Sequence, residues 1–384
     1  MRLKLERQNF LKAWQIAEKA ASSKTPQQSI SGILVKANES GNVILEATDM
    51  KSSIKCFADG VEVLEPGMAV LSVKIFGNLL KKTTAENVTL DVNSERGLLI
   101  YGKSKIRFTI YDVNEFPHLP DSAVSEPVCE IMCADLIRLI IEGSSASSQP
   151  QEFPRYMGTC LFRTTENVIK AVSTDGKRLA LSKMICSVSR NQDLLFTTPA
   201  LRELGKMLGS VKDDEMIKIS CDTSTAFFML PDCEYSIRLV DSNFPNYERI
   251  LNNNTRTTLK IARDELLEVI ERVDVIARTT PAHIMAFELQ TDGELIVTAR
   301  ATDAGIAQEF LSAEIEGAHM QIGFNVNYFQ DGLKAVGSSD VLIEFSHEEG
   351  QCRIKRSEND DFLYMLMPAR LTEQDLIADT ELIS

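Results

Sequence analysis

The sequence lacks the residue patterns that mark catalytic, metal and cofactor sites. Its four histidines lie far apart among 384 residues, and C-x-x-C, H-E-x-x-H, G-x-S-x-G and G-x-G-x-x-G do not occur. These absences argue against zinc sites, α/β-hydrolases and dinucleotide-binding folds. We therefore expect no metal and no cofactor, and an enzyme only if folding brings distant residues together.

Long apolar stretches are also missing. No run of eighteen apolar residues occurs, and the first ten residues, MRLKLERQNF, lack the apolar core of a signal peptide. The eight cysteines are scattered, which favours reduced thiols over a disulfide framework. We therefore expect a cytoplasmic protein that does not enter a membrane.

Charge is unevenly distributed along the chain. The formal net charge is −14, which argues against tight electrostatic binding of nucleic acid by the whole surface. Residues 1–24, however, hold six basic and two acidic side chains, whereas residues 372–384 hold four acids and no base. An acidic protein with such local basic faces can still contact DNA weakly.

The stretch Asp175-Gly-Lys-Arg178 combines turn residues with two cations. A phosphate-binding loop would need glycine at position 171 and a hydroxyl after the lysine, but Ala171 and Arg178 stand there. Because Asp-Gly favours tight turns and both flanks read as strands, we expect a β-hairpin. A catalytic pair of Asp175 and Lys177 at a domain junction is the alternative that would make the protein an enzyme.

A Thr-Asp pair recurs three times. Thr48, Thr174 and Thr302 each precede an aspartate, at spacings of 126 and 128 residues. An amphipathic helical pattern precedes each pair, and a second helical pattern and strand-like runs follow it. The first helical patterns cover residues 6–22, 133–146 and 262–277, and the second cover 74–83, 199–208 and 325–336. Repetition at a fixed period predicts three copies of one folding unit.

Each copy reads as an α+β domain with two helices on antiparallel strands. Polar stretches separate the copies, so the predicted domains are 1–125, 126–252 and 253–371, followed by an acidic tail at 372–384. Three such domains in tandem leave unpaired sheet edges at both ends, and unpaired edges seek partners. A second copy joined head to tail would cover these edges.

Together these features resemble one family, the bacterial DNA polymerase III β subunits, or sliding clamps. The resemblance runs from Met1 to about Leu371, and it rests on the three repeats and on STDGKRLA, NEFPHLP, NFPNYERIL, IGFNVNY and MPARL in this order. It implies three tandem DNA-clamp domains that close as a head-to-tail homodimeric ring. Such a ring is not an enzyme. It would encircle duplex DNA, slide along it, and tether the DNA polymerase III alpha subunit, the clamp loader and other proteins with clamp-binding motifs.

The resemblance implies loose, sequence-independent contacts with the duplex. A ring held topologically needs no tight phosphate contacts, which agrees with the negative net charge. The positions that match the family's DNA contacts are Lys24, Lys74, Lys103, Gln151 and Tyr156. Further cations on the helical patterns, at Lys12, Lys19, Arg138, Arg202 and Lys206, could add to the inner potential.

The resemblance also implies a groove between domains 2 and 3 that captures partner peptides. Its apolar residues would accept apolar anchors, and Arg178, Arg249 and Arg370 would form a polar rim that holds backbone carbonyls. The strand FLYMLM should turn alternate residues to the core. The matching positions are Met157, Thr174, Gly176, Lys177, Arg178, Leu179, Pro245, Arg249, Ile250, Asn325, Tyr328, Met365, Leu366, Met367, Pro368, Ala369, Arg370 and Leu371.

Two departures from the family pattern stand out. Ala369 replaces a larger Met, which should widen the groove. The tail after Leu371, TEQDLIADTELIS, extends beyond the family pattern, and it reads either as a disordered acidic tail or as a segment whose QDLI covers the groove. Besides the clamp, a repeat-built scaffold that binds proteins without encircling DNA would also explain three copies of one unit.

Overall fold

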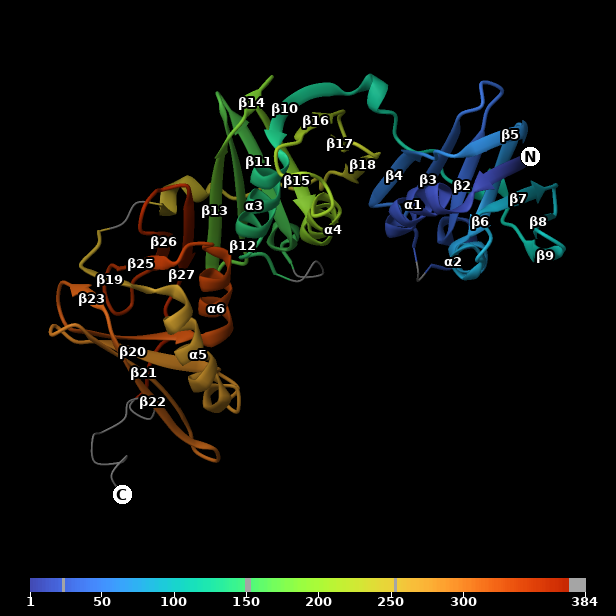
Figure 1. Ribbon diagram of the computed structural model, residues 1–384. Coiled ribbons are helices and arrows are strands. Elements are labelled where there is room, and N and C mark those ends of the chain that lie inside the picture. The colour runs from blue at the N-terminus through green and yellow to red at the C-terminus, as the bar shows by residue number, and fades with distance from the viewer. Residues whose placement is uncertain (23–24, 149–152, 252–253, 373–384) are drawn as a thin grey trace. The chain divides into compact units, whose positions relative to one another are not determined.

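The computed structural model describes residues 1–22, 25–148, 153–251 and 254–372 (Figure 1). These residues divide into two compact units. The first comprises Met1–Leu136, Cys186–Asn191 and Pro199–Val240, and the second comprises Ile137–Ile185, Gln192–Thr198 and the described residues from Asp241 onward. The α-helices are α1 (Arg7–Ala17), α2 (Asn78–Lys82), α3 (Cys133–Gly143), α4 (Thr198–Leu208), α5 (Arg263–Ala277) and α6 (Val326–Ala335).

The first unit contains two antiparallel sheets. The five-stranded sheet runs in the order β5 (Val61–Glu65), β1 (Arg2–Glu6), β7 (Asn87–Val92), β8 (Arg96–Tyr101) and β9 (Ser104–Thr109). The nine-stranded sheet runs in the order β14 (Ser187–Val188), β10 (Glu126–Met132), β16 (Met216–Cys221), β17 (Thr225–Met229), β18 (Cys233–Arg238), β4 (Ser52–Phe57), β3 (Val43–Thr48), β2 (Gly32–Ala37) and β6 (Gly67–Ser72).

The second unit also contains two antiparallel sheets. Its nine-stranded sheet runs in the order β15 (Gln192–Thr197), β11 (Thr159–Thr165), β12 (Val168–Thr174), β13 (Arg178–Ile185), β27 (Phe362–Leu366), β26 (Cys352–Arg356), β25 (Asp340–Phe345), β19 (Thr257–Ala262) and β23 (Glu314–Glu316). Its four-stranded sheet runs in the order β22 (Gly305–Ser312), β21 (Glu294–Ala301), β20 (Ile284–Leu289) and β24 (Met320–Asn325).

The core of the first unit gathers around Trp14 on α1. This side chain is fully buried and packs edge-on against Phe76, with 4.9 Å between ring centroids. A Cβ on Gly77 would lie 2.6 Å from the indole nitrogen, so only glycine fits beneath the ring. The helix predicted for 74–83 accordingly begins as a π-helical turn, Val73–Gly77, before α2.

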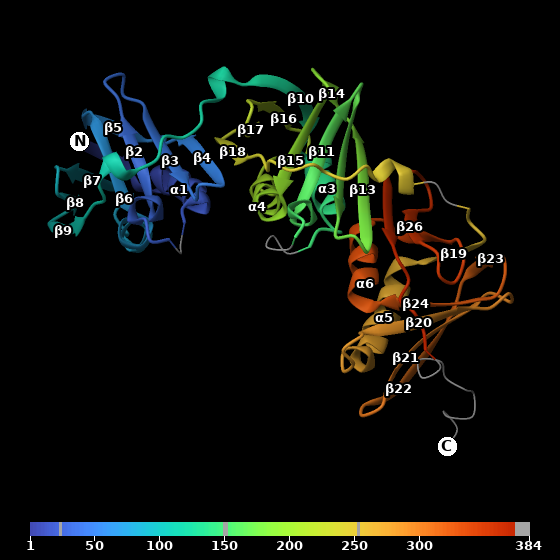
Figure 2. The ribbon, with the colours of Figure 1, turned by 180° about the vertical axis from the view of Figure 1, so that it is seen from behind.

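In the second unit, α5 and α6 lie side by side against the strands in both views (Figures 1 and 2). Leu266, Val269, Ile270 and Val273 of α5 are buried, as the helical pattern predicts. Phe287 of β20, Phe324 of β24 and Phe329 of α6 pack together, with ring centroids 4.9 to 5.5 Å apart. No helix in the described part of the chain is long and apolar enough to cross a membrane.

The third Thr-Asp turn differs from the other two. Thr48 and Thr174 end their strands, and each lies within the hairpin register, opposite Ser53 and Leu179. In the third copy β21 ends at Ala301, opposite Gly305, so Thr302 and Asp303 lie exposed in a shorter turn. The sequence predicts three equivalent turns, but only the first two share their geometry.

Candidate functional site

The turn between β12 and β13 is fixed by its own side chains. Thr174 Oγ1 donates to the carbonyl of Arg178 at 2.6 Å and accepts from the Gly176 amide at 3.1 Å. Oδ1 of Asp175 accepts from the amides of Lys177 and Arg178, both at 3.0 Å. Gly176 takes φ +85°, which favours glycine. Asp175 is therefore a turn residue, because its carboxylate bonds to backbone amides and to Arg178 and not to the side chain of Lys177.

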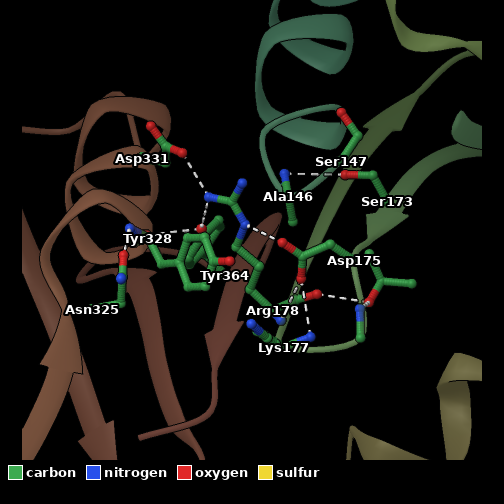
Figure 3. Close-up of polar contacts among 12 residues, drawn as sticks. Ala146, Ser147, Ser173, Asp175, Lys177, Arg178, Asn325, Tyr328, Asp331 and Tyr364 are labelled. Atoms are coloured by element: carbon green, nitrogen blue, oxygen red, sulfur yellow. Dashed lines mark hydrogen bonds and ion pairs between the residues drawn. The ribbon is translucent and has the colours of Figure 1, made fainter. Parts of the chain in front are cut away.

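Arg178 joins this turn to two other elements (Figure 3). Its Nε donates to Oδ2 of Asp175 at 2.9 Å, and Nη1 donates to Oδ2 of Asp331 on α6 at 2.6 Å and to the Tyr364 hydroxyl on β27 at 3.1 Å. The guanidinium carbon also lies 4.4 Å from the centroid of the Tyr328 ring. The side chain is only 9% exposed.

The surroundings of Arg178 keep its guanidinium charged. Burial opposes the charge, but Tyr364, Asp331 and Asp175 outweigh this effect and raise the pKa of Arg178. Burial raises the pKa of the Tyr364 hydroxyl, although Arg178 acts against the shift. Sequence predicts Arg178 as an open rim donor for a partner's carbonyls. The structure instead gives it a bracing position between the hairpin, α6 and β27.

The candidate residues on β13 and β27 meet in register. Arg178 lies opposite Leu366 and Leu179 opposite Met365, and the pairing continues when the Met367 amide donates to the Lys177 carbonyl at 2.9 Å. All five residues of β27 are buried, so the alternate residues expected to face the core are buried, and the residues between them are covered as well. The accessible side chains begin just beyond the strand, where Met367 is 53% exposed.

The chain after β27 lies against β24. The Ala369 amide donates to the Gly323 carbonyl at 2.8 Å, and a Cβ on Gly323 would meet Leu371 Cδ2 at 2.6 Å. Asn325 caps α6 by accepting from the Tyr328 amide at 3.2 Å. The structure therefore brings Asn325, Ala369 and Leu371 into one neighbourhood.

The remaining candidates lie on two neighbouring segments. Met157 approaches Gly176, because its Cε lies 3.4 Å from the place of a Cβ there. Its neighbour Tyr156 packs edge-on against Phe244, with 5.9 Å between centroids, which brings the segment of Pro245, Arg249 and Ile250 close. Ile250 is 49% exposed, and Pro245 and Arg249 are also exposed.

The predicted DNA contacts are distributed over both units. Lys74 on the π-helical turn and Lys103 between β8 and β9 are exposed in the first unit. Tyr156, in the second unit, is half-buried against Phe244. Lys24 and Gln151 lie outside the described residues.

Sequence reasoning missed a buried ionic cluster in the second unit. Glu142 on α3 is ion-paired with Arg356 on β26 and accepts from Ser182 Oγ at 2.6 Å. Arg356 also contacts Asp361, which lies 3.4 Å from Arg138. No motif links Glu142 with Arg356, which lie 214 residues apart in sequence. Burial raises the pKa of Glu142, against the effects of Ser182, Arg356 and Arg138.

The described residues provide no cluster of three or more His, Cys, Asp or Glu side chains suited to a metal ion. All eight cysteines are buried and unpaired.

Comparison with known proteins agrees with this fold. Three family models match the chain in succession: the N-terminal domain of the DNA polymerase III beta subunit at residues 1–120, its central domain at 131–246, and its C-terminal domain at 248–370. A beta sliding clamp of Staphylococcus epidermidis is 26% identical over 381 residues, covering 96% of this chain and 99% of the relative.

Solved structures of sliding clamps share the architecture. The DNA polymerase sliding clamp of Bacillus subtilis superimposes with a TM-score of 0.91 at 22% identity, covering 97% of this chain and all of that one. A sliding clamp of Pseudomonas aeruginosa bound to griselimycin gives a TM-score of 0.87 at 22% identity, with coverages of 97% and 100%. With three consecutive domain models matched and the clamp fold present, this chain belongs to the DNA polymerase III beta subunit family.

Proposed function

We propose that this chain is the processivity factor of a bacterial replicative DNA polymerase. Two copies form a ring around duplex DNA, slide along it without catalysing a reaction, and tether the DNA polymerase III alpha subunit, the clamp loader and other proteins with clamp-binding motifs. It works in the cytoplasm. The proposed domains are 1–125, 126–252 and 253–371, with an acidic tail at 372–384.

The observation that carries this proposal is a pair of edge strands that, among the described residues, have no neighbouring strand on one side. In each nine-stranded sheet, a four-stranded part joins a five-stranded part, through β4 and β18 in one unit and through β13 and β27 in the other. The two remaining sheets have four and five strands. In the four-stranded sheet, β22 is the equivalent of β4 and β13, and in the five-stranded sheet, β9 is the equivalent of β18 and β27. Both β22 and β9 are edge strands. Pairing β22 with β9 of a second copy would complete a third nine-stranded sheet and leave a closed ring.

The repeats predict the register of this junction. One residue directly precedes each Thr-Asp pair: Ala47, Ser173 and Ala301. In the hairpins these three residues lie opposite Ile54, Ala180 and Gly305, respectively. On the other side of the known junctions, Ile54 pairs with Tyr235 and Ala180 with Tyr364.

Tracing the ladders inward locates the third partner. Following the directly opposite residues from strand to strand, Tyr235 leads to Cys129 and Tyr364 leads to Leu259, and each of these end points lies four residues before a helix begins. In the five-stranded sheet of the first unit, the residue four positions before a helix is Leu3, and the same path from Leu3 leads back to Ile106 on β9. Ile106 is thus the counterpart of the two tyrosines. Gly305 of one subunit should therefore lie opposite Ile106 of the other.

The charge distribution supports loose contact with DNA. A net charge of −14 opposes tight binding of the duplex, while Lys74 and Lys103 offer exposed cations. We assign duplex contacts to Lys24, Lys74, Lys103, Gln151 and Tyr156. Such contacts position the duplex without reading its sequence.

The partner peptide is proposed to bind where β13, β27, α6 and the 244–251 segment meet. Exposed Met367 and Ile250 supply apolar surface for an anchor, and Lys177, Arg249 and Arg370 supply accessible cations. Thr174, Leu179, Met365 and Leu366 lie beneath this surface and fix its shape. Arg178 holds the hairpin and α6 in place rather than donating to the peptide.

Retention on DNA of different topology tests the ring. The protein, loaded on nicked circular DNA by a clamp loader, should stay bound at high salt and leave when the circle is cut. A topological link resists salt, whereas phosphate contacts do not. Equal retention on linear and circular DNA would contradict the ring and favour a repeat-built scaffold.

A further inference from the structure

The first unit contains a copy of the Thr174–Arg178 turn. Thr48 Oγ1 donates to the Ser52 carbonyl at 2.8 Å and accepts from the Met50 amide at 3.0 Å. Oδ1 of Asp49 accepts from the amides of Lys51 and Ser52 at 2.9 and 2.7 Å. The same hydrogen bonds hold the turn that leads into β13. The β4–β18 junction is therefore the structural counterpart of the β13–β27 junction.

The β4–β18 junction differs from the β13–β27 junction at the residue that directly follows the last residue of β18 or β27 paired across the junction. The Arg238 amide donates to the Lys51 carbonyl at 2.8 Å, as the Met367 amide does to the Lys177 carbonyl at 2.9 Å. An arginine thus replaces the exposed methionine. An open pocket of about 300 Å³ lies here, and its lining includes Met50, Lys51, Pro117, His118, Leu119 and Arg238.

Met50 occupies a strained backbone position in this pocket. It has φ +71°, in the left-handed region, where the equivalent turn has Gly176 at φ +85°. A non-glycine residue with this conformation is disfavoured, and such strain gathers at functional sites. The side chain is 51% exposed, so the strain is not offset by burial in a core. Its polarizable thioether instead gives the pocket an adaptable apolar wall.

Two cations face each other across the strands beside this wall. Lys51 and Arg238 are both exposed, and no hydrogen bond or ion pair joins either side chain to another described residue. Like charges in directly opposite positions repel, so the pair favours an anion between them. Asp49 and Asp222, the aspartates of the two turns, accept backbone amides through Oδ1.

We propose that this pocket is a second docking site, which binds a short acidic segment of a partner protein. A carboxylate lies between Lys51 and Arg238, and an apolar side chain packs against Met50, Pro117 and Leu119. A peptide fits better than a nucleic acid, because a methionine, prolines and a leucine line the pocket beside only two cations and a histidine.

Methyl NMR of the full-length protein with methionine and leucine labels tests the site. The probe is an acetylated octapeptide of alternating Glu and Leu, and the matched control has Gln in place of Glu. The acidic peptide should shift the Met50 and Leu119 methyl signals, and the Gln peptide should not. In Lys51→Gln/Arg238→Gln, the affinity read from Leu119 should fall at least about tenfold.

Met50→Gly separates binding from folding. Glycine relieves the left-handed strain, so Tm should stay equal or rise while the peptide affinity read from Leu119 falls. The proposal is overturned if the acidic peptide leaves Met50 unshifted, if the Gln peptide shifts it equally, or if the double variant binds like the parent chain. A shift produced by octathymidylate but not by the peptide would instead assign the site to nucleic acid.

Discussion

Nη1 of Arg178 lies 2.6 Å from Oδ2 of Asp331, and this contact joins the β12–β13 hairpin to α6. The two ends of the Arg178 network are unequal, because the side chains of Arg178 and Asp175 are 9% and 8% exposed and that of Asp331 is 48% exposed. Removing one partner of a buried ion pair lowers the free energy of unfolding far more than removing one partner of a surface pair.

Arg178→Ala should therefore lower the free energy of unfolding by about 3 kcal/mol, because it leaves the Asp175 carboxylate buried and unpaired. Asp331→Asn should cost less than about 1 kcal/mol. Arg178→Lys should not restore stability, since lysine cannot reach Asp175, Asp331 and Tyr364 with one planar group. Urea unfolding of the three variants measures these costs, and equal losses for Arg178→Ala and Asp331→Asn would refute the bracing role.

Glu142 gives the protein a pH-dependent element. Burial raises its folded-state pKa, so its stabilising contribution is complete below its ordinary pKa and is lost as pH rises through the folded pKa. Arg356 lowers this pKa, so Arg356→Met should raise it further. The variant should then lose stability, relative to the parent chain, as pH rises from the ordinary pKa of a glutamate through the raised folded-state pKa of Glu142.

Glu142→Gln/Arg356→Met is the matched control, because it has no carboxylate to ionise at this position. The urea midpoint of this double variant should change with pH much as that of the parent chain does. The midpoint of Arg356→Met should depart further from the parent chain as pH rises. If both variants fall in parallel with pH, Glu142 is not the group responsible.

The sequence predicts the helices well because their apolar residues repeat at helical spacing around buried side chains such as Trp14 and Leu266. It also predicts the β12–β13 hairpin, because Asp175 and Gly176 have the chemistry of a tight turn. The shorter third turn was not predictable, since Thr302-Asp303 matches the other copies in sequence and only the strand register separates it. The partners of Arg178 were also missed, because Asp331 and Tyr364 lie more than 150 residues away and belong to no motif.

Lys74 and Lys103 offer a test of the assigned DNA contacts. Each phosphate contact contributes about 0.9 to the slope of log affinity against log salt. Lys74→Ala/Lys103→Ala should therefore reduce this slope by at most about 2 for linear duplex, and equally for different sequences. Fluorescence anisotropy at several salt concentrations measures it. Lys218→Ala, at an exposed lysine 3.7 Å from Glu130, is the control and should leave the slope unchanged.

The proposed junction between subunits makes a prediction about covalent closure. With Gly305 opposite Ile106, Ala307 of one subunit lies opposite Ser104 of the other. These positions correspond to Cys56 and Cys233, which lie opposite each other in the β4–β18 junction. Directly opposite Cβ atoms in a sheet are about 4.5–5.5 Å apart, which is close enough for a disulfide after small adjustment.

Ser104→Cys/Ala307→Cys should therefore form a covalent dimer under mild oxidation, and a dimer linked at both junctions should remain on circular DNA in denaturant. Arg107→Cys/Ala307→Cys is the matched control, because its cysteines stand three residues out of register and on opposite faces of the sheet. The native cysteines are buried in both variants and should contribute equally. Non-reducing electrophoresis measures the yield. If the control crosslinks as efficiently as the matched pair, the register derived from the repeats is wrong, and a monomer in both cases would argue against pairing of β9 with β22.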